Sequence, residues 1–125
     1  MAQVAEGKWF EKPIGAEKTL RELLEKYMKE HSARNKALRS HIRDKSLADH
    51  LNQYLGDCLI TDISPRAISD YKVRRREEGS APATINYELR LLSHAYNLAI
   101  KEWEWVNFNP VSRVSMEKVN NQVDR

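Results

Sequence analysis

A long stripe of apolar side chains near the C-terminal end is the feature that most constrains the fold. Between residues 80 and 103, apolar residues recur at alternating steps of four and three positions, namely Ile85, Leu89, Leu92, Tyr96, Ala99 and Trp103. Residues at this spacing share one face of an α-helix. Leu91, Ala95 and Leu98 widen the apolar side, so we expect a central helix that packs against more than one neighbour.

Polar side chains occupy the sector opposite this stripe. At about 100° per residue, that sector holds Asn86, Arg90, His94, Asn97 and Lys101. Tyr87 also falls on the wetter side. Such a face either contacts solvent alone or binds a ligand, and the periodicity leaves both interpretations open.

Two more helices are expected upstream in the first half of the chain. A capping box at Thr19 and Glu22 predicts a helix that runs to about His31, followed by a polar, basic connection over residues 31–38. The second helix spans about 37–55 and ends at Gly56, with the apolar residues Leu38, Ile42, Leu47, Leu51, Tyr54 and Leu55. Because the step from 42 to 47 breaks the stripe, a shorter helix capped by Ser46 and Asp49 is the alternative. We favour the continuous helix.

The remaining helix boundaries follow from proline, glycine and serine. Ser64 and Pro65 predict the start of the third helix, which Gly79 ends. Ser80 is the expected cap of the fourth helix, which has Pro82 in its first turn. The pair at 109–110, Asn-Pro, ends the helical region.

The bulk composition fits a single all-α domain. The chain has 125 residues, of which 41% are hydrophobic, and only 4 Gly and 4 Pro. We therefore expect a compact bundle of four to five helices. The expected organisation is a flexible N-terminal arm over 1–18, in which Trp9 and Phe10 dock locally, a helical domain over 19–110 and a linker over 111–125.

Positive charge is clustered, although the formal net charge is only +3. Residues 34–45 contain five Lys or Arg and only one acid, and residues 72–76 read KVRRR. Clusters of this kind suit a polyanion, most simply nucleic acid. Charge alone would equally suit a solvated helix face.

Several other classes of function have no support in the sequence. Cys58 is the only cysteine, and neither a secretory signal nor an apolar run of about 20 residues is present. The four histidines are scattered, and there is no glycine loop for phosphate. We therefore expect a soluble cytoplasmic protein with no membrane partner, no metal, no cofactor and no small-molecule ligand.

Short pieces of sequence also occur in a characteristic order. They are Leu55-Gly56-Asp57, Asp62-Ile63-Ser64-Pro65, Gly79-Ser80, Ala83-Thr84-Ile85-Asn86 and Asn109-Pro110. In this order they resemble the core-binding, SAM-like domain of phage-type tyrosine recombinases (integrases), over roughly residues 19–115. The resemblance implies a helical domain that clamps one side of a recombination site in double-stranded DNA, with other integrase protomers as further partners.

In such enzymes a second, C-terminal domain performs catalysis with an Arg/Lys/His/Arg set and a nucleophilic tyrosine. No tyrosine sits in a C-terminal tail here, and Tyr27, Tyr71 and Tyr96 lie on apolar stripes. The resemblance therefore implies that this chain lacks the active site and is no enzyme alone. Residues 111–125 would lead towards the catalytic domain.

The same resemblance gives the polar helix faces a role in DNA binding. On the fourth helix it implies contacts from Ser80, Thr84, Asn86 and Arg90, and on the second helix from Arg39, Arg43 and Lys45. On the third helix, Lys72, Arg75 and Arg76 are expected to clamp phosphates, although Glu77 and Glu78 weaken the local field. Two alternatives stay open. One is a stand-alone helical DNA-binding regulator, and the other is a helical protein–protein module, which exposed Leu91, Leu98 or Trp105 would favour.

Overall fold

The computed structural model describes residues 14–119, and every regular element in this part of the chain is helical. The N-terminal residues 1–13, which include Trp9 and Phe10, and the last residues, 120–125, lie outside it. The elements are η1 (Ile14–Glu17), α2 (Leu20–Tyr27), η2 (Met28–Ser32), α3 (Ala33–Asn35), α4 (Leu38–Leu55), α5 (Pro65–Glu77), α6 (Pro82–Lys101) and η3 (Pro110–Arg113). The expected all-α bundle is confirmed.

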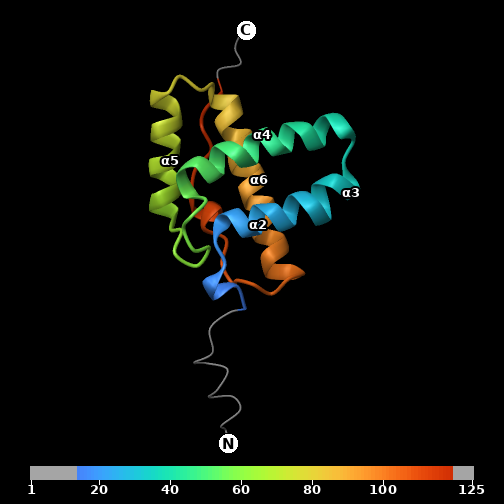
Figure 1. Ribbon diagram of the computed structural model, residues 1–125. Coiled ribbons are helices and arrows are strands. Elements are labelled where there is room, and N and C mark those ends of the chain that lie inside the picture. Colours follow the sequence, from blue (N-terminus) through green and yellow to red (C-terminus); the bar gives the residue numbers. More distant parts are fainter. Residues whose placement is uncertain (1–13, 120–125) are drawn as a thin grey trace, which may run out of the picture.

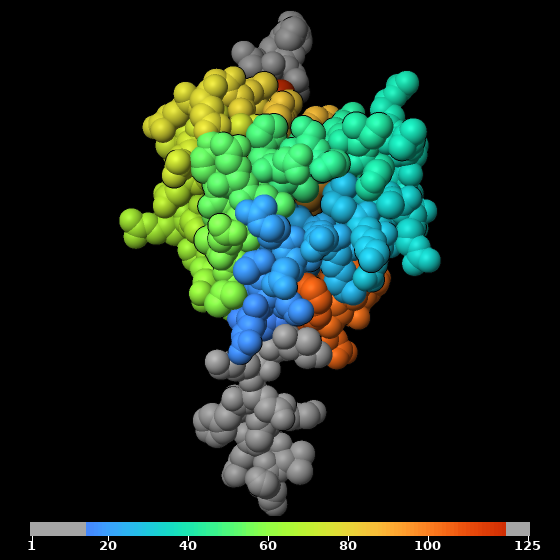
Figure 2. Space-filling view, viewed as in Figure 1, coloured from blue at the N-terminus to red at the C-terminus, as the bar shows by residue number. Residues whose placement is uncertain are grey.

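The helices are arranged around α6, which crosses behind α2 and α4 (Figure 1). The segments α2 and α4 run side by side and are joined through α3, while α5 stands along the edge of the bundle. Figure 2 shows that the side chains of α2 and α4 cover the middle of α6 on this side. No helix within 14–119 combines the length and the apolar character needed to cross a membrane.

The apolar stripe of α6 forms the centre of the core. Ile85, Leu89, Leu92, Tyr96 and Ala99 are fully buried, whereas Trp103 is only partly buried. The hydroxyl of Tyr96 donates a hydrogen bond of 2.8 Å to the carbonyl of Ile60, so even the polar tip of this stripe is satisfied. The prediction of a central helix is therefore confirmed.

Most of the predicted caps are present, but one is wrong. The capping box of Thr19 and Glu22 is complete, and the Ser64 hydroxyl accepts from the amide of Ala67 at the start of α5. Ser80 does not cap α6: the N-cap residue is Ala81, which has no side-chain hydrogen bond. Gly79, with φ of 91°, turns the chain between the helices, and this turn places Ser80 one residue too early.

The first helical segment is longer than predicted, because it continues through the wide turn η2 and through α3 to Asn35. The polar stretch that suggested a connection holds a buried serine. The Ser32 hydroxyl donates to Asp44 of α4 at 2.8 Å and lies 2.9 Å from Nδ1 of His41. These contacts tie the helical hairpin together, and only residues 36–37 form the connection.

The helix α4 is continuous, as we favoured, but its apolar residues are not all in the core. Leu38 and Ile42 are 73% and 60% exposed, and Leu47 is the first apolar residue of the helix that is buried. Asp44 is buried before it, because the Lys36 ammonium neutralises its carboxylate and the Ser32 hydroxyl donates a hydrogen bond to it. The broken stripe thus marks a buried polar contact.

The chain after Asn109 stays against the domain. Asn109 accepts from the amide of Val111 and starts η3, and Val111 is buried. The following residues continue along α5 and α6, with polar contacts as far as Glu117. Packing therefore extends beyond the expected boundary at 110.

Candidate nucleic-acid interface

A groove lies between α4 and α6, on the polar side of both helices. It is lined by Tyr27, Lys36, Ala37, Ser40, Arg43, Asp44, Leu47, Tyr87, Arg90, Leu91 and His94. Arg43 comes from α4 and Arg90 from α6, so two helices distant in sequence present cations to the same hollow. The crossing of α4 over α6 produces this convergence.

The two arginines are positioned by one aromatic ring. The guanidinium carbon of Arg43 lies 5.0 Å from the ring centroid of Tyr87, and that of Arg90 lies 5.7 Å from it. Tyr87 is 44% exposed, and its ring lies close to both guanidinium groups. Stacking of this kind restrains a guanidinium group while leaving its N–H donors free for another partner.

Within residues 14–119, no carboxylate lies within ion-pair distance of Arg39, Arg43 or Arg90. All three side chains are exposed. Arg39 stands one helical turn before Arg43 on α4 and extends the same positive surface. Cations without internal partners are the ones available to an external anion.

The groove is also lined by His94, whose ring already has a hydrogen-bond partner. His94 Nδ1 lies 3.0 Å from the Tyr27 hydroxyl, and the rings of His31 and His94 are 4.5 Å apart. Burial, with the nearby positive charges of His31 and Lys36, holds the pKa of His94 below its usual value. The positive charge at the mouth of the groove therefore comes from the arginines.

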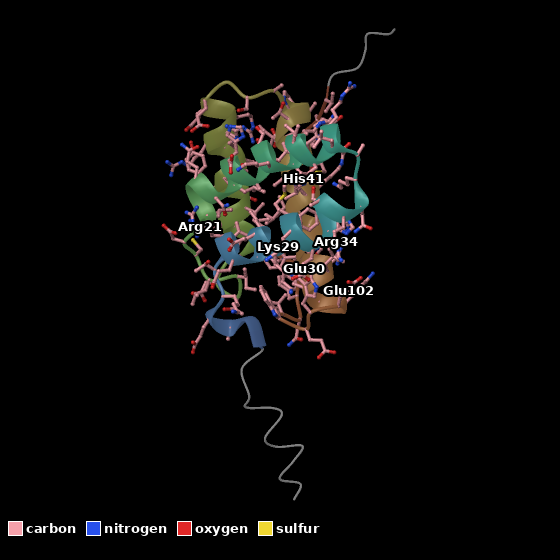
Figure 3. All side chains as sticks on the ribbon, turned by 45° about the vertical axis from the view of Figure 1, so that its right-hand side comes forward. Arg21, Lys29, Glu30, Arg34, His41 and Glu102 are labelled. Atoms are coloured by element: carbon pink, nitrogen blue, oxygen red, sulfur yellow. The ribbon has the colours of Figure 1, made fainter. Side chains whose placement is uncertain are left out.

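Lys45, which the sequence grouped with Arg39 and Arg43, lies on the other side of α4. It lines a separate groove between α2 and α4, together with His41 and Lys29, and its ammonium is 3.9 Å from Asp49. Figure 3 shows His41 of α4 above Lys29 of η2 at this groove. Two residues beyond Arg43, the helix has turned by about 200°, which separates the two side chains.

Arg75 is almost completely buried. It is 6% exposed and donates to both carboxylate oxygens of Glu88, at 3.0 and 2.6 Å. Glu88 is fully buried and also accepts from Tyr71. Burial and this hydrogen bond raise the pKa of the Tyr71 hydroxyl. The expectation that Arg75 clamps a phosphate therefore has to be revised, because its guanidinium joins α5 to α6.

The chain segment after η3 contacts Lys72, Arg76 and Asn86. Asn86 is only 4% exposed, although the periodicity placed it on the polar face. Ser80 and Thr84 are half-buried at the start of α6, where no side chain caps the helix. The structure thus brings Arg43 and Arg90 to one groove, with Arg39 one helical turn before Arg43 on α4, and it gives the remaining predicted residues other surroundings.

Tyr87 is the residue at this surface whose role sequence reasoning missed. The signal was an aromatic residue on a polar face, three positions before Arg90, which is a spacing that brings side chains together. Metal chemistry has no comparable support, since residues 14–119 contain no cluster of three His, Cys, Asp or Glu side chains suited to an ion.

Comparisons with known proteins bear on the family and the fold of this chain. The family model described as phage integrase, N-terminal domain, matches residues 16–118. A crystal structure of a lambda integrase dimer bound to a COC′ core site is similar, with a TM-score of 0.72 and 25% sequence identity. The match covers 80% of this chain and 36% of that one, so the present chain corresponds to about a third of its length. No curated protein sequence matches.

Proposed function

Because this chain belongs to the phage integrase N-terminal domain family, we propose that it binds duplex DNA through the groove between α4 and α6. In this proposal the domain grips one side of a recombination site, while another part of the parent tyrosine recombinase carries out strand cleavage. The solved relative supports a DNA partner, since it is an integrase dimer bound to a core site. Other protomers and a cytoplasmic location belong to the same proposal.

One observation carries this proposal: Arg43 and Arg90 both lie near the ring of the exposed Tyr87 and have no carboxylate partner within 14–119. Two guanidinium groups held in this way can each donate to a phosphate or to the O6 and N7 atoms of guanine. The exposed ring can pack against a sugar or base. Arg39 extends the contact along the DNA backbone.

Three of the five tyrosines are poorly placed to act as nucleophiles. Tyr27, Tyr71 and Tyr96 are fully buried, and each hydroxyl has a hydrogen-bond partner. Burial raises the pKa of each of the three hydroxyls. A phenol that must reach a phosphate has to be accessible and easily deprotonated, and these three are neither.

Charge reversal tests the proposal. Arg43→Glu and Arg90→Glu should each lower the affinity for a fluorescein-labelled random-sequence duplex by at least tenfold in an anisotropy titration, because a cation contact becomes a repulsion. Lys101→Glu is the matched control. It makes the same charge change at the opposite end of α6, on an exposed side chain, and should have a much smaller effect. Equal losses in all three variants would contradict a localised interface.

The protein–protein alternative is less well supported. Leu91 is buried, and Leu98 and Trp105 are partly buried against the core, so the side chains expected to form such a surface face inward. Charge reversal at Arg43 separates the two functions, since it would abolish the DNA binding of a DNA-binding domain but leave the partner binding of a protein module intact.

A further inference from the structure

A single stretch of chain, residues 115–117, engages three of the side chains that sequence reasoning assigned to DNA. Lys72 donates to the carbonyl of Ser115, and its ammonium lies 3.2 Å from the carboxylate of Glu117. Asn86 donates to the Glu117 carbonyl at 2.9 Å and accepts from the Glu117 amide at 2.7 Å. This stretch therefore covers a cationic surface between α5 and α6.

The carboxylate of Glu117 binds Arg76 as an oxyanion ligand would. Arg76 donates from Nε to one oxygen at 2.7 Å and from Nη2 to the other at 3.4 Å. A guanidinium group grips a phosphate in the same two-pronged way. The hydrogen bonds and charges of Arg76 and Lys72 hold the pKa of the Glu117 carboxyl below its usual value despite burial, so it is ionised at neutral pH.

The contacts that hold this stretch are almost entirely polar. Met116 and Val119 remain exposed, whereas Val111 and Val114 pack against the core just before the stretch. Little apolar burial would be lost if the residues after Val114 moved away. The Arg76 side chain is half exposed, so solvent and salt screen its ion pair.

This surface and the groove between α4 and α6 share the helix α6. Asn86 lies one helical turn before Arg90 on α6, and Tyr87 is its direct neighbour. A duplex that contacts Arg43 and Arg90 would bring its negative backbone towards Glu117. The carboxylate would repel this backbone, while the cations beneath it would attract it.

We propose that Lys72 and Arg76 form a second phosphate-binding site for duplex DNA, which Glu117 occupies in the free protein and from which DNA displaces it. This proposal rests on the proposed function and extends it. In it, the segment that follows η3 competes with DNA phosphates for Lys72 and Arg76. Asn86 acts as the positioning residue that places Glu117 over the two cations.

Removal of the competing charge tests this site. Glu117→Gln should bind a random-sequence duplex several-fold more tightly than the wild type, because the DNA backbone no longer has to displace a carboxylate from Lys72 and Arg76. Glu102→Gln, at an exposed position after α6, makes the same change in net charge and serves as the control. Equal behaviour of the two variants would overturn the proposal.

A double-mutant cycle tests whether the added DNA affinity of Glu117→Gln depends on Arg76. Arg76→Gln should leave the DNA affinity of the wild type nearly unchanged, since the lost phosphate contact is offset by an ion pair with Glu117 that no longer has to be broken. In the Glu117→Gln background the same substitution should remove much of the added affinity. Additive effects of the two substitutions would contradict the shared site.

Hydrogen exchange gives a readout on the unaltered protein. The Glu117 amide donates to Asn86, so it should exchange slowly in the free protein and faster when a saturating duplex is added. Slower or unchanged exchange would overturn the displacement. If Arg43→Glu keeps full DNA affinity, the proposed function itself fails. If it loses affinity while Glu117→Gln matches its control, only the second site fails.

Discussion

The guanidinium group of Arg75 and the carboxylate of Glu88 form a buried ion pair, in which Nη2 and Oε2 lie 2.6 Å apart. The pair connects α5 to α6, and Tyr71 completes it with a hydrogen bond of 2.6 Å to the other oxygen. Every member of this cluster has a partner, which is the condition for placing charge inside a helical core.

Breaking this pair should destabilise the protein strongly. Arg75→Met leaves the Glu88 carboxylate buried without its cation, and we expect a loss of about 3–5 kcal/mol in the free energy of unfolding. The double variant Arg75→Met/Glu88→Leu should recover most of that loss, since both charges are gone. Urea denaturation followed by circular dichroism measures both. A fully stable Arg75→Met variant with reduced DNA affinity would instead identify Arg75 as a DNA contact.

The ring of Tyr87 should matter more than its hydroxyl. Tyr87→Phe keeps the stacking surface between the two arginines and should bind DNA as the wild type does. Tyr87→Ala removes it, and the loss of two exposed cation–π contacts, each worth about 0.5–1 kcal/mol, should weaken binding several-fold. Anisotropy titrations compare the variants. A defect in Tyr87→Phe as large as that in Tyr87→Ala would mean that the hydroxyl is the functional group.

Two apolar residues of α4 should respond differently to truncation. Leu51 is fully buried, so Leu51→Ala should cost about 2–5 kcal/mol of unfolding free energy. Ile42 is mostly exposed, so Ile42→Ala should change the free energy of unfolding by no more than about 0.5 kcal/mol. Thermal or urea unfolding of the two variants measures this difference, and similar losses at the two positions would contradict the orientation of α4.

Stability should fall in mild acid because of His94. Its pKa in the folded protein lies below the ordinary value, so the unfolded chain binds more protons as the pH drops through about 6.5. The stability present at higher pH is therefore lost progressively, until His94 is also protonated in the folded protein. Urea midpoints at pH 7.5 and 5.5 should differ less in His94→Gln than in the wild type. An equal difference in both proteins would exclude His94 as the source.

Local signals in the sequence predicted much of the fold. The stripe from Ile85 to Ala99 and the start of α5 at Ser64 and Pro65 depend on neighbours within one or two helical turns. Such features can be recognised before any tertiary contact is known. The same holds for Arg43 and Arg90, which lie on polar faces of long helices.

Burial that depends on a partner distant in sequence could not be predicted from such local patterns. Asp44, Glu88 and Asn86 are polar but buried, because Ser32, Arg75 and the backbone of Glu117 satisfy them. The periodicity of polar and apolar residues indicates which face of a helix a residue occupies. It does not reveal a hydrogen-bond or ion-pair partner on another helix. The exposed Leu38 and Ile42 are the reverse case, since no element covers them within the described residues.

The salt dependence of DNA binding tests the central claim most directly. Anisotropy titrations of one duplex at several salt concentrations should give a slope that becomes shallower by about 0.9 in Arg43→Gln and again by about 0.9 in Arg43→Gln/Arg90→Gln, one phosphate contact for each arginine. Lys101→Gln should keep the wild-type slope. Slopes that are the same in all four proteins would show that the groove between α4 and α6 does not bind the DNA backbone.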